Sequence, residues 1–148
     1  MSSLPPQQSL YLEQYKAYLT DLGNIGSRYG TTNAFYLSVI TALLGVLALS
    51  GKDRGFAQLD VSLVFIVCGF GVLLCLIWFA TIWYFSTLFR AKFAVLRQLE
   101  SRLAHPSFAN EYLFLRRARA LWWTRTEKYI PLAMGAFLAA IVVLRLLA

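Results

Sequence analysis

The stretch VSLVFIVCGFGVLLCLIWFATIWYFS, residues 61–86, contains no charged side chain and consists mainly of valine, leucine, isoleucine and aromatic residues. About 20 consecutive apolar residues are enough for a helix to cross the hydrocarbon core of a bilayer. Gly69 and Gly71 lie inside the stretch, where a membrane helix tolerates glycine. Residues 61–86 therefore predict a transmembrane helix, and the rest of the fold is organised around it.

Two further apolar stretches flank the first one along the chain. Residues 34–50 are uncharged, and residues 129–148 carry only Arg145, whose long side chain can extend to the membrane surface. Pro131 falls in the first turn of the third helix, where proline is tolerated because that N–H has no partner in the helix. The sequence thus predicts an all-α integral membrane protein with three transmembrane helices.

The composition of the 148 residues supports this class. Hydrophobic residues make up 59% of the chain and charged residues 14%, against about 45–50% and about 25% in soluble proteins. Such a chain is neither disordered nor a disulfide scaffold. Cys68 and Cys75 lie seven residues apart on one helix, about 10 Å and too far for a disulfide.

Basic residues are distributed unevenly, which predicts the orientation. Nine of the 14 lysines and arginines lie between Arg90 and Lys128, and an excess of positive charge marks the cytoplasmic side. We therefore expect residues 1–33 and 87–128 to be cytoplasmic, and residues 51–60 and the C-terminus to be external.

The helical pattern continues beyond the membrane spans. Nothing breaks the helix between Val61 and Leu103 except the two glycines. We expect one continuous helix there, ended by His105-Pro106, and a further helix over residues 110–125 that completes a basic cytoplasmic hairpin.

The N-terminal segment, residues 9–27, is predicted to be an amphipathic helix. Apolar and aromatic residues recur at spacings of three and four and so share one face: Tyr11, Tyr15, Tyr18, Leu22 and Ile25. This stripe either packs on the second helix of the same chain or forms a seam between subunits.

Small residues share a face on each predicted span. On the first span they are Ala34, Ser38, Thr41, Gly45 and Ala48, on the second Cys68, Gly71 and Cys75, and on the third Gly135 and Ala139. Small faces allow membrane helices to approach closely. They either pack the three spans of one chain or join neighbouring subunits, and the Ser38/Thr41 face could instead line a narrow pore.

No pattern of catalytic residues is visible. The sequence has one histidine, no glycine-rich phosphate loop, no paired carboxylates and no combination of nucleophile and base. We expect no enzymatic activity and no cofactor or metal, and we expect Glu100, Glu111 and Glu127 to form surface ion pairs. The cluster Arg116, Arg117, Arg119 and Arg125 suggests a surface for anionic lipid, or alternatively for a nucleotide, RNA or protein partner.

Several segments in order resemble a known family. They are Tyr15-Lys16, residues 33–38 (NAFYLS), residues 91–96 (AKFAVL), residues 99–103 (LESRL) and residues 126–131 (TEKYIP). Together they resemble the RipA family of small octameric bacterial membrane proteins. The resemblance implies a homo-octamer in the bacterial inner membrane and an association with fitness inside a host cell.

Three functions follow as hypotheses. The first is an oligomeric scaffold or stress- and host-adaptation factor that acts through its cytoplasmic helical layer. The second is a gated pore or membrane-depolarising effector, by analogy with small multi-span proteins in antiviral defence. The third is a membrane-tethered module that binds a nucleotide, RNA or protein.

Overall fold

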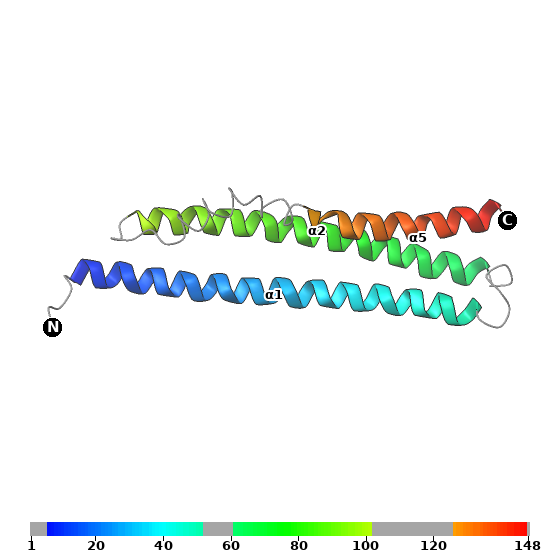
Figure 1. Ribbon diagram of the computed structural model, residues 1–148, viewed down its shortest axis with the longest axis horizontal. Coiled ribbons are helices and arrows are strands. Elements are labelled where there is room, and N and C mark those ends of the chain that lie inside the picture. The colour runs from blue at the N-terminus through cyan, green and yellow to red at the C-terminus, as the bar shows by residue number, and fades with distance from the viewer. Residues whose placement is uncertain (1–5, 52–60, 102–125, 148) are drawn as a thin grey trace. The chain divides into compact units, whose positions relative to one another are not determined.

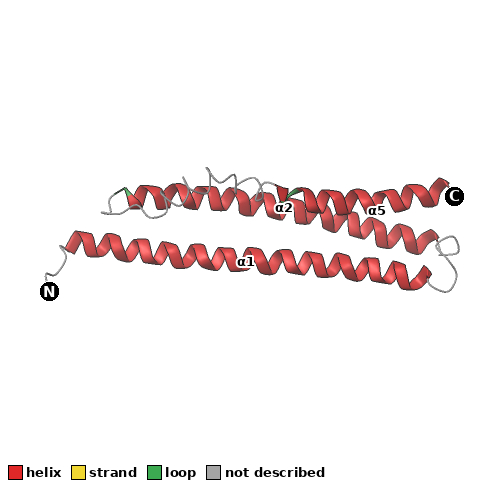
Figure 2. Ribbon diagram, viewed as in Figure 1, coloured by secondary structure: helices red, strands yellow, loops and turns green. Residues whose placement is uncertain are grey.

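Three helices make up nearly all of the part of the chain that the structure describes. The computed structural model describes residues 6–51, 61–101 and 126–147. Its helices are α1 (Pro6–Gly51), α2 (Val61–Glu100) and α5 (Tyr129–Leu147) (Figure 1). Within these ranges no strand occurs (Figure 2). The predicted all-α class is confirmed.

All three helices are long and apolar enough to cross a membrane. The most apolar 18-residue stretch has the highest mean hydropathy in α2 and the lowest in α1, where Asn33, Tyr36, Ser38 and Thr41 interrupt the apolar residues. The predicted multi-pass membrane protein with three long apolar helices is therefore confirmed.

Helix α1 joins two segments that the sequence indicated separately. The amphipathic segment at residues 9–27 and the span at residues 34–50 belong to one helix without a break. The connecting residues 28–33 (RYGTTN) contain no proline, and a single glycine does not end a helix whose neighbouring turns are stable.

Helix α2 also continues beyond its apolar stretch, as predicted. It ends at Glu100, and the backbone N–H of Ser101 donates to the Arg97 carbonyl at 3.1 Å. The predicted continuation to Leu103 and the predicted helix over residues 110–125 lie outside the described residues.

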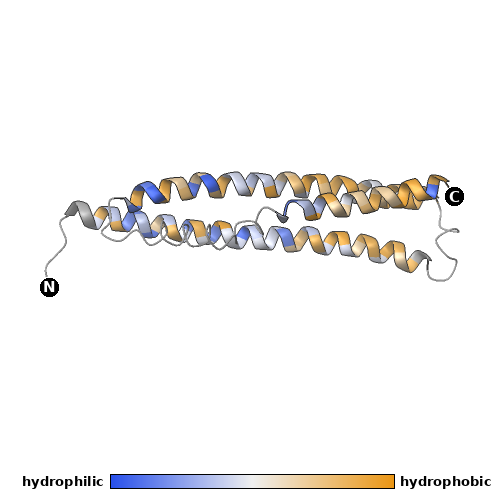
Figure 3. Cartoon of the chain, turned by 45° about the horizontal axis from the view of Figure 1, so that its top comes forward, coloured by the Kyte–Doolittle hydropathy of each residue, from blue (hydrophilic) through white to orange (hydrophobic). Residues whose placement is uncertain are grey.

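The chain divides into two compact units, here called unit 1 and unit 2. Unit 1 comprises residues 1–29 and 84–125, and unit 2 comprises residues 30–83 and 126–148. Hydrophilic residues recur along the helices of unit 1, whereas hydrophobic residues cover the helices of unit 2 (Figure 3).

Unit 1 pairs the N-terminal half of α1 with the C-terminal part of α2. Ile25 and Leu96 are buried between these segments. The ring of Tyr29 meets Phe85 and Phe89 edge-on, with centroids 5.4 and 6.1 Å apart. Aromatic pairs of this geometry add to the stabilisation that comes from buried apolar area.

Unit 2 contains the most apolar parts of all three helices. Its core consists of Ile40, Leu47, Val64, Val67, Cys68, Cys75, Trp78, Ile82 and Leu138. Many large apolar side chains point outward instead, among them Leu49, Ile66, Leu144 and Leu147, which are 67–80% exposed. Such a surface is stable in lipid and costly in water, in agreement with a membrane location.

Candidate functional site

The tyrosine stripe of α1 faces α2 of the same chain in unit 1. The Tyr15 hydroxyl donates a hydrogen bond to Oε1 of Glu100 at 3.0 Å. One turn further along α1 is Tyr18, and the centre of its ring lies 4.8 Å from the ammonium of Lys92. Leu22 is half-buried and Ile25 is buried. The structure thus shows the packing within one chain, which is one of the two alternatives that the sequence left open.

Glu100 is buried, which the sequence did not predict. Its side chain is 1% exposed at the last residue of α2, whereas we expected a surface ion pair. The expected surface position was wrong, because the Tyr15 side chain of α1 contacts this end of α2. Burial of a carboxylate is costly, and the negative end of the helix dipole adds to the cost, so partners such as the Tyr15 hydroxyl must compensate.

The pKa of Tyr15 reflects the same contact. Burial raises it above the ordinary value of 10.0, and the hydrogen bond to Glu100 and the negative charge of that carboxylate raise it further. Tyr15 therefore stays neutral and remains a donor over the whole physiological pH range.

Lys92 forms the second polar connection between the helices of unit 1. Its ammonium is paired with the Asp21 carboxylate and also lies over the Tyr18 ring. The hydrogen bond to Asp21 raises the pKa of Lys92, and the negative charge of Asp21 adds to this, although partial desolvation acts in the opposite direction.

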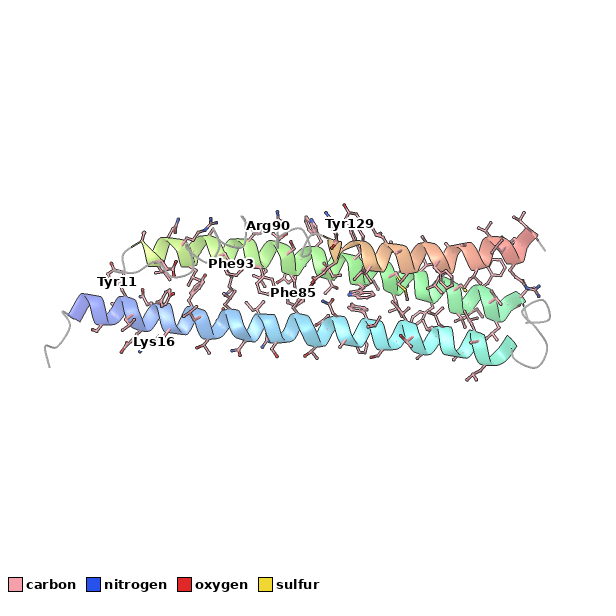
Figure 4. All side chains as sticks on the ribbon, viewed as in Figure 1. Tyr11, Lys16, Phe85, Arg90, Phe93 and Tyr129 are labelled. Carbon is pink, nitrogen blue, oxygen red and sulfur yellow. The ribbon has the colours of Figure 1, made fainter. Side chains whose placement is uncertain are left out.

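Other basic residues of unit 1 point outward. In Figure 4, Lys16 lies on the side of α1 away from α2, and Arg90 lies on the side of α2 away from α1, whereas Phe85 lies toward α1. Arg90 donates from Nε to the Ser86 carbonyl at 3.2 Å and is exposed.

In unit 2 the small residues of α2 and α5 meet one another. A Cβ placed on Gly135 would lie 3.3 Å from the Cβ of Cys75, and one placed on Gly71 would lie 2.7 Å from the Leu138 side chain. The two helices therefore run antiparallel in close contact, which only small residues allow. Gly71, Cys75 and Gly135 thus pack the spans of one chain, whereas Ala139 is exposed.

The small face of α1 behaves differently. Ala34, Ser38, Thr41 and Ala48 are exposed and Gly45 is half-exposed. The Ser38 hydroxyl donates to the Ala34 carbonyl and the Thr41 hydroxyl to the Leu37 carbonyl, each at 2.8 Å. No other helix of the same chain covers these residues within the described part of unit 2.

A polar cluster between α1 and α2 in unit 2 was missed by the sequence reasoning. The Trp78 indole N–H donates to Oδ1 of Asn33 at 2.8 Å, and the Tyr36 and Thr81 hydroxyls lie 3.4 Å apart. The Tyr36 ring stacks on Trp78, with centroids 5.9 Å apart. The signal was the occurrence of hydrogen-bonding side chains inside two apolar segments, where each one needs a partner.

Other predicted residues cannot be placed. Arg116, Arg117, Arg119 and Arg125 lie outside the described residues. Within residues 6–51, 61–101 and 126–147, no three His, Cys, Asp or Glu side chains form a group that could hold a metal ion.

Comparison with known proteins assigns the chain to a family. The profile of the octameric membrane protein family (8xMP) matches residues 12–147. Searches of curated proteins and of solved structures found no match. The family match covers all three helices and both units, and it agrees with the resemblance to the RipA family. The chain is therefore a member of the octameric membrane protein family.

Proposed function

We propose that the protein is a homo-octameric scaffold of the bacterial inner membrane, without enzymatic activity. Membership of the octameric family supports self-association. Eight subunits in a ring would present eight copies of unit 1 on one side of the membrane. The scaffold would act through this helical layer in adaptation to stress or to a host.

The exposed small face of α1 carries the proposal. Its five residues between Ala34 and Ala48, at spacings of three and four, are all small. Helices α2 and α5 leave this face uncovered within the described residues. Apolar side chains gain little by leaving lipid for a protein contact, so membrane helices associate mainly where small residues permit close approach. This face meets that requirement, and a second copy of the chain is the occupant we propose.

Glycines on α1 support the same assignment. A Cβ placed on Gly23, Gly26, Gly30 or Gly45 would meet nothing within 4 Å. Glycine inside a helix costs about 1 kcal/mol relative to alanine. Packing within the chain does not explain these positions, whereas close approach of a neighbouring subunit would explain them.

The hydroxyl groups on this face favour a dry contact over a water-filled pore. Ser38 and Thr41 both donate to carbonyls of their own helix. Their donors are thereby satisfied without water, so the face can pack against another helix at low cost. The tyrosine stripe, in contrast, already packs on α2, and we therefore place the main subunit contact on the small face.

The experiment measures oligomer mass. Gly45→Leu places a large side chain in the centre of the face and should convert the octamer into smaller species in native mass spectrometry. Val46→Phe is the control, because Val46 is exposed but lies about 100° around the helix from Gly45. An octamer that survives Gly45→Leu would show that the subunits meet elsewhere.

Membrane placement completes the proposal. The basic residues of unit 1 favour a cytoplasmic location for this unit, with the N-terminus inside and the C-terminus outside. Anionic headgroups are then the expected lipid partners. Protease protection in inverted membrane vesicles tests the orientation, since unit 1 should be cleaved there and protected in intact cells.

The second candidate function is a gated pore. The hydroxyl oxygens of Ser38 and Thr41 retain lone pairs that could accept hydrogen bonds from water in a pore. A scaffold would not require such acceptors. A flux assay on reconstituted liposomes separates the two functions. The scaffold predicts no leak of ions, and a leak that Ser38→Ala and Thr41→Val reduce would establish the pore. The third candidate, a module that binds nucleotide, RNA or protein, depends on the arginine cluster at residues 116–125.

A further inference from the structure

The end of unit 2 at which α5 begins combines a cation with exposed aromatic rings. The Lys128 ammonium lies 5.2 Å from the centre of the Tyr129 ring. Both residues are exposed, Tyr129 to 56%, and the next residue, Ile130, is 51% exposed. In Figure 4 the Tyr129 side chain points away from α2.

The packing of α5 on α2 brings a third residue to the same level. Cys75 lies opposite Gly135 and the helices are antiparallel. Eight residues forward from Cys75 is Trp83, and eight residues back from Gly135 is Glu127. Trp83 is 63% exposed. Trp83 of α2 and Tyr129 of α5 thus lie at about the same level of unit 2.

On α5 this height is also a boundary of polarity. Glu127 and Lys128 are charged, and residues 129–144 that follow contain no charge, while α2 is uncharged on both sides of Trp83 as far as Phe89. Exposed tryptophan and tyrosine at such a boundary lie at the level of the lipid headgroups and the glycerol backbone. An ammonium at that depth is within reach of phosphate oxygens, and it needs an anion there because the surrounding dielectric is low.

We propose that Lys128 and Tyr129, with Trp83 at the same level, form a binding site for the phosphate of an anionic phospholipid. Lys128 supplies the charge, and the two rings cover the adjacent glycerol and acyl region. Glu127 precedes Lys128, is exposed and carries the opposite charge, so it weakens the site and sets its affinity.

The test is native mass spectrometry of the purified oligomer in detergent, with palmitoyl-oleoyl phosphatidylglycerol or phosphatidylcholine added. Lys128→Gln should reduce retention of phosphatidylglycerol about fivefold, the effect of one basic residue near an anionic surface. Glu127→Gln should increase it. Retention of phosphatidylcholine should not change in either variant.

Lys16→Gln is the control, because it removes the same charge from an exposed position in unit 1. Unchanged retention of phosphatidylglycerol by Lys128→Gln, or equal losses in Lys128→Gln and Lys16→Gln, would overturn the proposal. If the Lys128→Gln variant failed to assemble, the Glu127→Gln variant would decide. The proposed site requires that this variant retain more phosphatidylglycerol than the parent, and equal retention would contradict the site. The same spectra give the number of subunits. Loss of lipid binding is therefore distinguished from loss of the octamer that the scaffold proposal requires.

Discussion

Unit 1 and unit 2 hold their helices together by different interactions. In unit 1 the contacts between α1 and α2 include a hydrogen bond from Tyr15 to Glu100 and an ion pair between Lys92 and Asp21. In unit 2, α2 and α5 meet at Gly71 and Gly135, where backbones approach closely. Water makes apolar burial the main driving force and exposed ion pairs weak, whereas lipid removes that driving force and leaves close packing. The difference indicates that the part of α2 in unit 1 meets water and the part in unit 2 meets lipid.

The largest expected effect is a clash in unit 2. Gly135→Val adds a side chain at a position where Cβ alone would lie 3.3 Å from Cys75. Overpacking of this kind costs about 1–3 kcal/mol. Thermal unfolding followed by circular dichroism should show a lower Tm for this variant. Gly69→Val is the control, because nothing lies within 4 Å of that position, and equal losses in both variants would contradict close packing between α2 and α5.

The next effect is loss of the donor to Glu100 in unit 1. Tyr15→Phe removes the hydroxyl and leaves a buried carboxylate with one partner fewer, which costs about 1–2 kcal/mol. Limited proteolysis of unit 1 should become faster, while the contacts of unit 2 stay unchanged. Tyr84→Phe removes a hydroxyl from a 61% exposed side chain and should have little effect, so similar rates for the two variants would argue against the contact.

A smaller effect is expected from the polar cluster of unit 2. Asn33→Ala removes the acceptor of the Trp78 indole N–H. Hydrogen bonds between membrane helices contribute on average about 0.6 kcal/mol. The loss should appear in unfolding by sodium dodecyl sulfate, together with a shift of tryptophan fluorescence. A double-mutant cycle with Trp78→Phe should give a coupling of that size, and strictly additive effects would show that the bond contributes nothing.

The smallest effect concerns alkaline pH. The pKa values of Tyr15 and Lys92 are both raised in the folded protein, so their contributions are complete below about pH 10 and decrease as pH rises through the folded pKa values. The stability of unit 1 should therefore decline above pH 10. Lys92→Gln should reduce the decline only slightly because its ion pair is exposed, and Tyr15→Phe should reduce it more. If both variants and the parent lose stability equally above pH 10, the decline does not come from Tyr15 or Lys92.

Sequence periodicity was sufficient for the helices, but it left their pairing open. The long uncharged stretch in α2 and the spacing from Tyr11 to Ile25 depend only on local geometry, which the chain itself determines. The burial of Glu100 and the bond from Trp78 to Asn33 depend on residues 85 and 45 positions apart. Such pairs follow from the register of two helices, which a single sequence does not specify.

The same limit explains the small faces. Those of α1, α2 and α5 have similar residues, yet Gly71 and Gly135 are covered within the chain and Ser38 and Thr41 are exposed. Composition alone could not distinguish them, because both kinds of contact need the same small side chains. The topology covers one face within the chain, and the face that it leaves exposed is the one we propose for assembly.

The burial of the two cysteines has a practical consequence. Cys68 is fully buried and Cys75 is 2% exposed, and the contact with Gly135 covers the latter. A membrane-permeant alkylating reagent can reach Cys75 only when α5 separates from α2. The rate of alkylation therefore measures how often the third helix leaves its place, so the chain carries its own reporter of that opening without any added label.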